Sequence, residues 1–119
     1  MAWTKAQSGK RFIRYTGEAQ SSKTATSSAT MMIGNFTQVD VQVLHADHAD
    51  TSTWAVVVSN DGGTTWSTAG SDTTTGASGD TFVSINGAPG ALMKILVTET
   101  DGDADATLTP HLVMKSAGS

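Results

Sequence analysis

Apolar and polar residues alternate along several short segments of the chain. In the segment 36–44, Val39, Val41 and Val43 lie on one side of an extended backbone, and polar residues occupy most of the positions between them. Alternation at every second residue is typical of a β-strand with one face in the core and the other in water. No segment shows apolar residues at helical spacing. Further segments with strand character are residues 10–16, 53–58, 81–85, 91–99 and 106–115.

The segment 53–66 predicts a β-hairpin around which the core is organised. Trp54 and Val56 lie on the same face of its first strand. The Asn-Asp-Gly-Gly run at 60–63 contains residues that tolerate positive φ, so the chain can reverse direction there. A return strand is expected to follow, with Trp66 buried in the core.

Seven or eight short strands separated by turn residues favour an all-β fold, either an antiparallel β-sandwich or a jelly-roll-like barrel. We expect the sandwich domain at residues 30–119, preceded by an extended N-terminal arm at 1–29 in which 10–16 can form one strand. Pro110 has no backbone N–H, so the last strand is expected at a sheet edge or with a bulge. Residues 70–80 are expected to form a long loop.

Composition and charge limit the function classes. The length of 119 residues suits one domain, and the absence of Cys excludes disulfides and Cys-based metal sites. Residues 1–23 hold five basic residues and one acid, whereas residues 24–119 hold two basic residues and ten acids. The acidic body should repel phosphates, which argues against a nucleic-acid partner, while the basic arm can dock on an acidic surface.

No segment is apolar for long enough to span a bilayer, so no membrane partner is expected. The N-terminus lacks the apolar stretch of a secretion signal, which fits a protein that is made in the cytosol and released by lysis, and equally an ordinary cytosolic protein.

The hairpin turn carries a recognisable motif. Its sequence SNDGGTTW, from Ser59 to Trp66, meets every specified position of the pattern S-x-D-x-G-x-T-W. The segment thereby resembles the Asp box of sialidase-type propellers. The resemblance implies a folding device, in which the Asp side chain satisfies turn N–H groups and the Trp plugs the sheet, with no part in catalysis. We interpret Ser59, Asp61, Gly63 and Trp66 as a structural turn; the alternative is a sugar-contacting loop.

Three alternating acids, Asp101, Asp103 and Asp105, are similar to the start of a calcium loop, because calcium prefers clustered carboxylate oxygens. An EF-hand loop also needs Gly at its sixth position and Glu at its twelfth. Those positions hold Ala106 and Leu112. We therefore expect a solvated turn and no metal, with calcium as the alternative.

His45 and His48, together with Asp47 and Asp50, contain enough ligand types for a weak zinc or nickel site. Residues three apart on a strand point to opposite faces, so only a loop could bring both histidines to one ion. The preferred interpretation is an exposed polar loop. No Ser/His/Asp set has an informative spacing, so neither an enzyme nor a cofactor is expected.

The alternating segment 39–43, the hairpin at 54–66 and the closing strands at 92–98 and 106–109 are joined by Thr-, Ser- and Gly-rich connections. In this order of elements the body, about residues 30–115, resembles small β-sandwich virion proteins of tailed bacteriophages. The resemblance implies a non-enzymatic structural role in the virion, as a capsid decoration (cement) protein or a small head or tail component. The alternative is a carbohydrate-binding or host-surface adhesion module, which needs exposed aromatic side chains.

The arm combines positive charge with apolar side chains that could anchor an interface. We expect residues 1–29 to lie partly on a neighbouring chain, as an added strand or a strap. The predicted partners are further copies of the chain, with a trimer as the first expectation, and other virion proteins such as the major capsid protein. The predicted interface residues are Trp3, Lys5, Lys10, Arg11, Phe12, Ile13, Arg14 and Tyr15.

Overall fold

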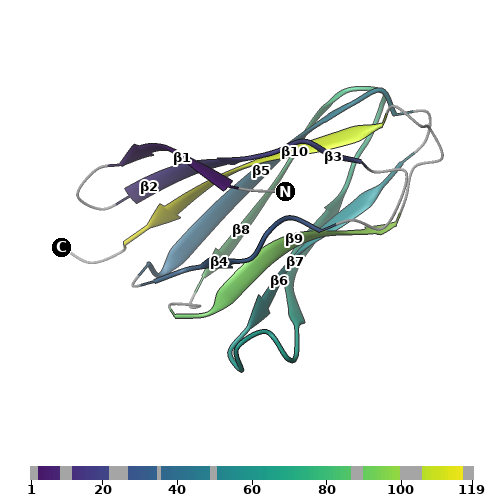
Figure 1. The fold of residues 1–119 in the computed structure, drawn as a ribbon. Helices are drawn as coiled ribbons and strands as arrows, with labels where there is room; N and C mark the ends of the chain where they lie inside the picture. Colours follow the sequence, from purple (N-terminus) through teal and green to yellow (C-terminus); the bar gives the residue numbers. More distant parts are fainter. Residues whose placement is uncertain are drawn as a thin grey trace.

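A computed structural model of the chain describes residues 3–8, 12–21, 27–34, 36–48, 51–86, 90–99 and 106–116 (Figure 1). These residues form ten strands and no helix, so they contain no helix that could cross a membrane. The strands are β1 (Trp3–Ser8), β2 (Phe12–Gly17), β3 (Gln20–Ser21), β4 (Met31–Met32), β5 (Gln38–Ala46), β6 (Thr53–Ser59), β7 (Ser67–Thr73), β8 (Gly79–Asn86), β9 (Leu92–Glu99) and β10 (Thr107–Lys115).

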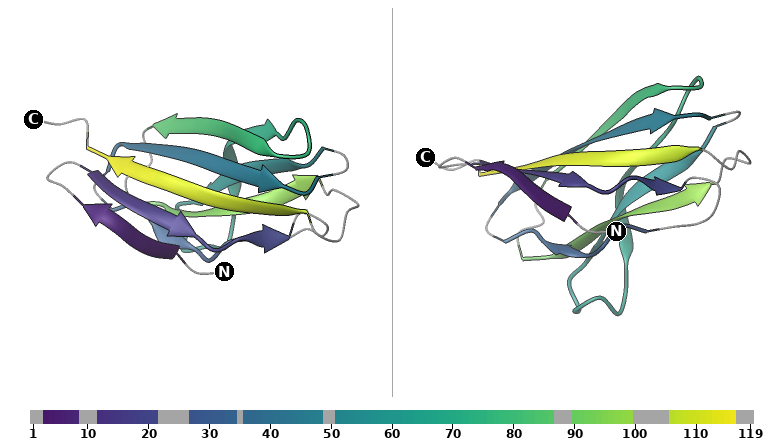
Figure 2. Two further views of the ribbon diagram at one scale, coloured as in Figure 1. Left: turned by 90° about the horizontal axis from the view of Figure 1, so that it is seen from above. Right: turned by 45° about the horizontal axis from the view of Figure 1, so that its top comes forward.

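The strands form two antiparallel sheets that pack face to face (Figures 1 and 2). The larger sheet has the order β1-β2-β10-β5-β8, with β3 also paired to β10, and the smaller sheet has the order β4-β9-β6-β7. The prediction of an all-β antiparallel sandwich is confirmed. The barrel alternative is wrong, because the pairing leaves the two sheets separate and each keeps its own edge strands.

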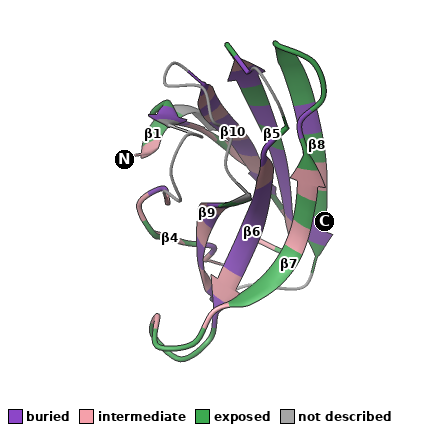
Figure 3. Ribbon diagram, turned by 90° about the vertical axis from the view of Figure 1, so that its right-hand side faces the viewer, coloured by how far each residue is buried: buried purple, intermediate pink, exposed green. Residues whose placement is uncertain are grey.

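The core lies between the sheets and follows the predicted alternation. On β5, Val39, Val41 and Val43 are buried. The core residues of β10 lie beside them in the same sheet, and those of β9 and β6 face them from the other sheet. Figure 3 shows β6 buried along most of its length while β7 is mostly exposed. Burial of this contiguous apolar cluster is the main favourable term in folding. The other large members of the cluster are Ile33, Trp54, Val56, Met93, Ile95, Val97, Leu108, Leu112 and Met114.

Trp54 connects the two sheets at the centre of this core. It is 0% exposed, and its Nε1–H donates a 2.6 Å hydrogen bond to Thr81 Oγ1. Trp54 belongs to β6 in the smaller sheet, and Thr81 belongs to β8 in the larger sheet. An indole N–H buried without an acceptor would cost about 1–3 kcal/mol, so this bond fixes how β6 sits against β8.

The N-terminal segment is part of the domain, which corrects the expectation of an extended arm. Its strands β1 and β2 form the outer part of the larger sheet, beside β10 (Figure 2, left). Trp3 and Tyr15 pack against the core, and Trp3 Nε1–H donates to the carbonyl of Ala29 at 2.9 Å. The physical reason is that β10 needs a partner on this side, and these apolar side chains complete the core beneath it.

Pro110 lies within an internal strand, which corrects the expectation of an edge position, while the expected irregularity is present on one side of the strand as a one-residue shift of register. On one side β10 pairs continuously with β5. On the other side β2 pairs up to the match of His111 with Thr16, and β3 resumes pairing at Leu108. The ladder is therefore interrupted where Pro110 has no N–H to donate, so its burial costs no hydrogen bond.

The expected loop at 70–80 is also shorter than predicted, because β7 continues to Thr73 and β8 begins at Gly79. Gly70 allows these two strands to approach at the end of the sandwich. A Cβ atom on Gly70 would lie 2.4 Å from Val83 Cγ1, which is closer than van der Waals contact permits. Glycine is required here for close packing between the sheets.

Replacing Gly70 by alanine should therefore destabilise the fold by about 1–3 kcal/mol, the usual cost of an overpacked core. Urea titration of the free energy of unfolding tests this. Ser71→Ala, on the same strand but exposed, is the control and should change that free energy by less than about 0.5 kcal/mol. Adding Val83→Ala to Gly70→Ala should relieve part of the loss; a double variant no more stable than the sum of both single losses would contradict the steric explanation.

Candidate functional site

The turn between β6 and β7 has the hydrogen bonds of a side-chain-supported loop. Asp61 Oδ1 accepts the N–H groups of Thr64 at 3.1 Å and Thr65 at 2.9 Å, and also the hydroxyl of Ser59 at 2.7 Å. The Ser59 hydroxyl oxygen in turn accepts the Gly63 N–H at 2.9 Å. The N–H of Thr65, with the Ser59 hydroxyl, lowers the pKa of Asp61 to about 2. The ionised carboxylate is therefore a structural part of the turn.

Trp66 lies on the solvent-facing side of the smaller sheet, which corrects the expectation of a core residue. It is only partly buried, and its Nε1–H donates to the carbonyl of Gly63 at 3.0 Å. The ammonium of Lys94 lies 4.4 Å from the ring centroid. Lys94 pairs with Val57, and both residues are out of phase with the core-facing positions of their strands. Trp66 therefore covers the outside of the sheet, and its ring also binds a cation.

His45 and His48 are buried, with exposed fractions of 4% and 5%, which corrects the expectation of an exposed loop. Their ring centroids are 5.1 Å apart. His45 Nε2–H donates to the Thr75 carbonyl, and His48 Nδ1–H donates to the Ala46 carbonyl. The His45 bond holds the end of β5 to the β7–β8 connection, and three of the four ring nitrogens of the pair are bonded within the chain. The fourth, His45 Nδ1, is buried without a hydrogen-bond partner among the described residues.

A serine lies beside this histidine pair but cannot act as a nucleophile. Ser52 Oγ is 2.9 Å from His48 Nε2, which accepts its proton in the hydrogen bond. Ser52 is 0% exposed, and its N–H and carbonyl are both bonded to Thr74. No substrate can reach the hydroxyl, so the Ser52–His48 contact is structural.

Predicted site residues of three groups fall outside the described part of the chain. These are Lys10 and Arg11 of the predicted interface, Asp50 beside the two histidines, and the acids of the predicted turn, Asp101, Asp103 and Asp105. Among the residues that are described, no cluster of three or more His, Cys, Asp or Glu side chains could hold a metal ion.

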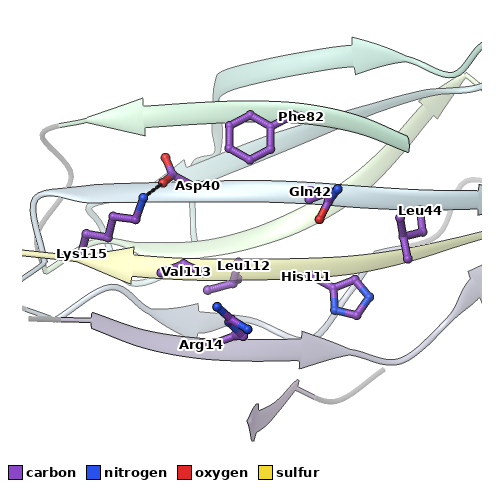
Figure 4. A pocket seen from close by; sticks show the side chains of 9 residues that line it. All are labelled: Arg14, Asp40, Gln42, Leu44, Phe82, His111, Leu112, Val113 and Lys115. Carbon is purple, nitrogen blue, oxygen red and sulfur yellow. Dashed lines mark ion pairs between the residues drawn. The ribbon is translucent and has the colours of Figure 1, made fainter. Parts of the chain in front are cut away.

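The surface with the most varied chemistry is the solvent-facing side of the larger sheet, which we call the outer face (Figure 4). It is formed by the residues of β2, β10, β5 and β8 that alternate with the core positions. Pairing places them in rows across the four strands. One row is Arg14, Val113, Asp40 and Ser84, and the next is Thr16, His111, Gln42 and Phe82. A shallow groove runs over this surface, lined by Arg14, Asp40, Gln42, Leu44, Phe82, His111, Leu112, Val113 and Lys115.

Asp40 is the most constrained group of the outer face. It is 8% exposed and forms an ion pair with Lys115. Ser84 Oγ–H donates to it at 2.5 Å, and Gln38 Nε2–H at 2.9 Å. Burial raises the pKa of Asp40, but hydrogen bonds from Lys115, Ser84 and Gln38 outweigh burial and lower the pKa below its usual value. The carboxylate is satisfied within the chain and has no free lone pair suited to acid–base chemistry at neutral pH.

Apolar side chains make the outer face unusual. Phe82 is 56% exposed and Leu44 is 43% exposed, on adjacent strands. Sequence reasoning missed both residues. The signal available in the sequence was alternation along this strand. Val83 and Ile85 lie on the core face, so Phe82, one residue out of phase with them, must point to solvent. An exposed phenylalanine next to an exposed leucine is suited to contact with another molecule.

The described residues of the predicted interface are divided by the fold. Phe12 and Arg14 lie on the outer face, whereas Ile13 and Tyr15 have the opposite phase and face the interior. Lys5 is exposed on the edge strand β1, opposite Tyr15. The structure therefore brings Arg14 together with His111 and Phe82, residues that are distant in sequence.

The pKa of Asp61 predicts a specific acid sensitivity. Because its folded pKa is below the unfolded value of about 3.9, its contribution to stability is present above about pH 4 and is lost as pH falls toward 2. The difference in unfolding free energy between wild type and Asp61→Asn should therefore shrink over this window, as measured by urea titration at several pH values. Asp72→Asn, a carboxylate on β7, is the matched control. A difference for Asp61→Asn that does not vary between pH 5 and pH 2 would show that the carboxylate charge is irrelevant to the turn.

The chain matches no protein-family model and no curated protein. Among solved structures, its fold is similar to part of the Arthrobacter globiformis T6 isomalto-dextranase complexed with panose, with a TM-score of 0.48 and 15% sequence identity. The similarity covers 92% of this chain, which spans only 17% of the length of that protein. A match at this level assigns neither a family nor an activity.

Proposed function

We propose that the chain is a non-enzymatic structural protein that packs its outer face against other proteins, and that the assembly is the virion of a tailed bacteriophage. Its role there is that of a capsid decoration protein or a small head or tail component. The observation that carries the proposal is the exposure of Phe82 and Leu44 on adjacent strands of a sheet face that also exposes Arg14, on β2. Aromatic residues and arginine are enriched at protein–protein interfaces and among the residues that dominate their energy.

The state of the polar groups supports a binding role over a catalytic one. Asp40 is neutralised by Lys115 and two further donors, and the Ser52–His48 pair is buried. Asp61 is committed to its own turn. These three groups are thus already used to hold the fold.

The aromatic side chains favour a protein partner over a sugar. Trp54 is buried, Trp3 packs against the core, and the ring of Trp66 is covered by Lys94. Phe82 alone among the described aromatic residues is highly exposed. One small ring beside a leucine forms an apolar anchor for a protein surface rather than a series of stacking platforms.

The second candidate function is a carbohydrate-binding or host-surface adhesion module that uses the same groove. The observation in its favour is that Gln42 and His111 lie in the row of Phe82 and could bind hydroxyl groups next to its ring. Polar groups around one apolar ring are a common feature of small-ligand sites.

The virion proposal predicts that antibodies against the recombinant chain detect it in phage particles purified from cultures that express it. Added recombinant chain should also bind particles from which it has been stripped. Phe82→Ser should weaken that binding by at least about tenfold, because loss of an aromatic anchor costs more than about 1.4 kcal/mol. Met32→Ser is the matched control, since Met32 is exposed but lies on β4 in the other sheet.

Absence of the chain from purified particles would overturn the virion proposal. Equal binding by wild type and Phe82→Ser would overturn the role of the outer face. Binding to an immobilised glycan panel that is lost in Phe82→Ser would instead support the carbohydrate-binding candidate.

A further inference from the structure

We propose that the partner of the outer face is a second copy of the chain, in a two-fold dimer whose larger sheets cross at nearly a right angle. The inference rests on the proposed function, since it names the molecule that covers the outer face. It is carried by how charge and apolar surface are distributed over the four strands of that face.

Charge is separated across the outer face. The basic residues Arg14, His111 and Lys115 lie on β2 and β10, and the acidic residues Asp40 and Asp80 lie on β5 and β8. Lys115 and Asp40 pair with each other across the two inner strands, β10 and β5. What remains is a positive group on one side and a negative group on the other, which is self-complementary under two-fold symmetry.

Arg14 and Asp80 cannot satisfy each other within one chain. Arg14 is in the row of Ser84, whereas Asp80 is in the row of Leu44, two rows further along and three strands away. With strands about 4.8 Å apart and about 3.3 Å per residue, the two positions are about 20 Å apart. Both side chains are exposed, and Arg14 forms no ion pair with a described residue. Asp80 accepts one bond, from Gln42 Nε2–H at 2.9 Å.

The midpoint between these two positions is the pair formed by His111 and Gln42. A two-fold axis through this point, in the plane of the face and perpendicular to the line from Arg14 to Asp80, places each Arg14 on the other copy's Asp80. Strands of the two sheets then cross at about 90°, which is one of the two common ways in which sheets pack. Two equivalent ion pairs close the interface at opposite corners.

The same axis gives the exposed phenylalanine a place to pack. The two-fold rotation places Phe82 of one copy above the row of Val113 and Asp40 in the other copy, between β10 and β5. This position is in the groove that Arg14, Val113 and Lys115 line. The exposed ring is thereby removed from water against the stem of Lys115 and the Val113 side chain.

The two sheets share a small area in such a contact. Four strands about 4.8 Å apart span about 19 Å, so sheets that cross at about 90° overlap over about 19 Å by about 19 Å before corrugation is counted. This is about half of the roughly 800 Å² of accessible surface that each partner contributes to a standard protein interface. The two ion pairs and the Phe82 ring therefore carry most of the affinity, and the dimer is expected to be weak.

A charge-exchange experiment tests the pairing directly. Sedimentation equilibrium of the full chain should show a dimer that dissociates in Arg14→Asp and in Asp80→Arg, with Kd raised at least about tenfold in each. The double variant Arg14→Asp/Asp80→Arg should recover the wild-type Kd to within about threefold, because each exchanged charge again meets its opposite in the partner. Since the two positions are about 20 Å apart in one chain, recovery can arise only between chains.

Two matched controls carry the same charge changes elsewhere on the surface. Lys5→Asp lies on the edge strand β1, and Asp72→Arg lies on β7 in the smaller sheet; both should leave Kd unchanged. Thermal melting verifies that each variant is folded. If Asp80→Arg fails to fold through loss of its bond to Gln42, Asp80→Asn replaces it and should weaken the dimer in the same direction.

A wild-type chain that is monomeric at millimolar concentration would overturn the dimer, as would single variants with wild-type Kd or a double variant no tighter than either single variant. Particle binding that still depends on Phe82 in a strictly monomeric chain would overturn the dimer while leaving the structural role in place. A dimer with the expected charge behaviour in a chain that is absent from phage particles would overturn the virion proposal and leave the dimer in place.

Discussion

The hydrogen bond between Trp54 and Thr81 is the contact on which the arrangement of the two sheets depends. Trp54 contributes the largest fully buried side chain of the core, and its single polar atom must find an acceptor there. That acceptor comes from the opposite sheet. Shape and polarity therefore act together, because a shift of β6 against β8 would both open a cavity beside the indole and leave its N–H unpaired.

This constraint explains features at the periphery of the sandwich. With β6 fixed against β8, the neighbouring strand β7 must pass close to Val83, and Gly70 supplies the space. The chain then turns through a short connection that is held to the end of β5 by His45 and by the His48 backbone N–H, which donates to Ala77. Buried histidines in this position act as donors that fix the connection to the strand.

The N-terminal strands determine which surface is left for function. Because β1 and β2 cover the side of β10, the larger sheet ends in a short polar edge strand, and its wide outer face becomes the surface most suited to contact. The ionic and apolar groups there come from four regions of the chain, around Arg14, Asp40 to Leu44, Phe82 and His111. A mixed surface of this kind is typical of interfaces between folded proteins that also exist separately.

The sequence by itself determined the local features of this protein, namely the core-facing side of a strand and the hydrogen bonds of the hairpin turn. Alternation identified the core face of β5, and the Ser-Asn-Asp-Gly-Gly run identified a turn in which Asp61 accepts backbone N–H groups, because period and turn chemistry depend only on neighbouring residues. It could not determine which strands pair or what covers each face. The internal position of Pro110, the surface position of Trp66, the burial of His45 and the exposure of Phe82 all depend on partners far away along the chain, and those partners are brought together only by the packing of the two sheets.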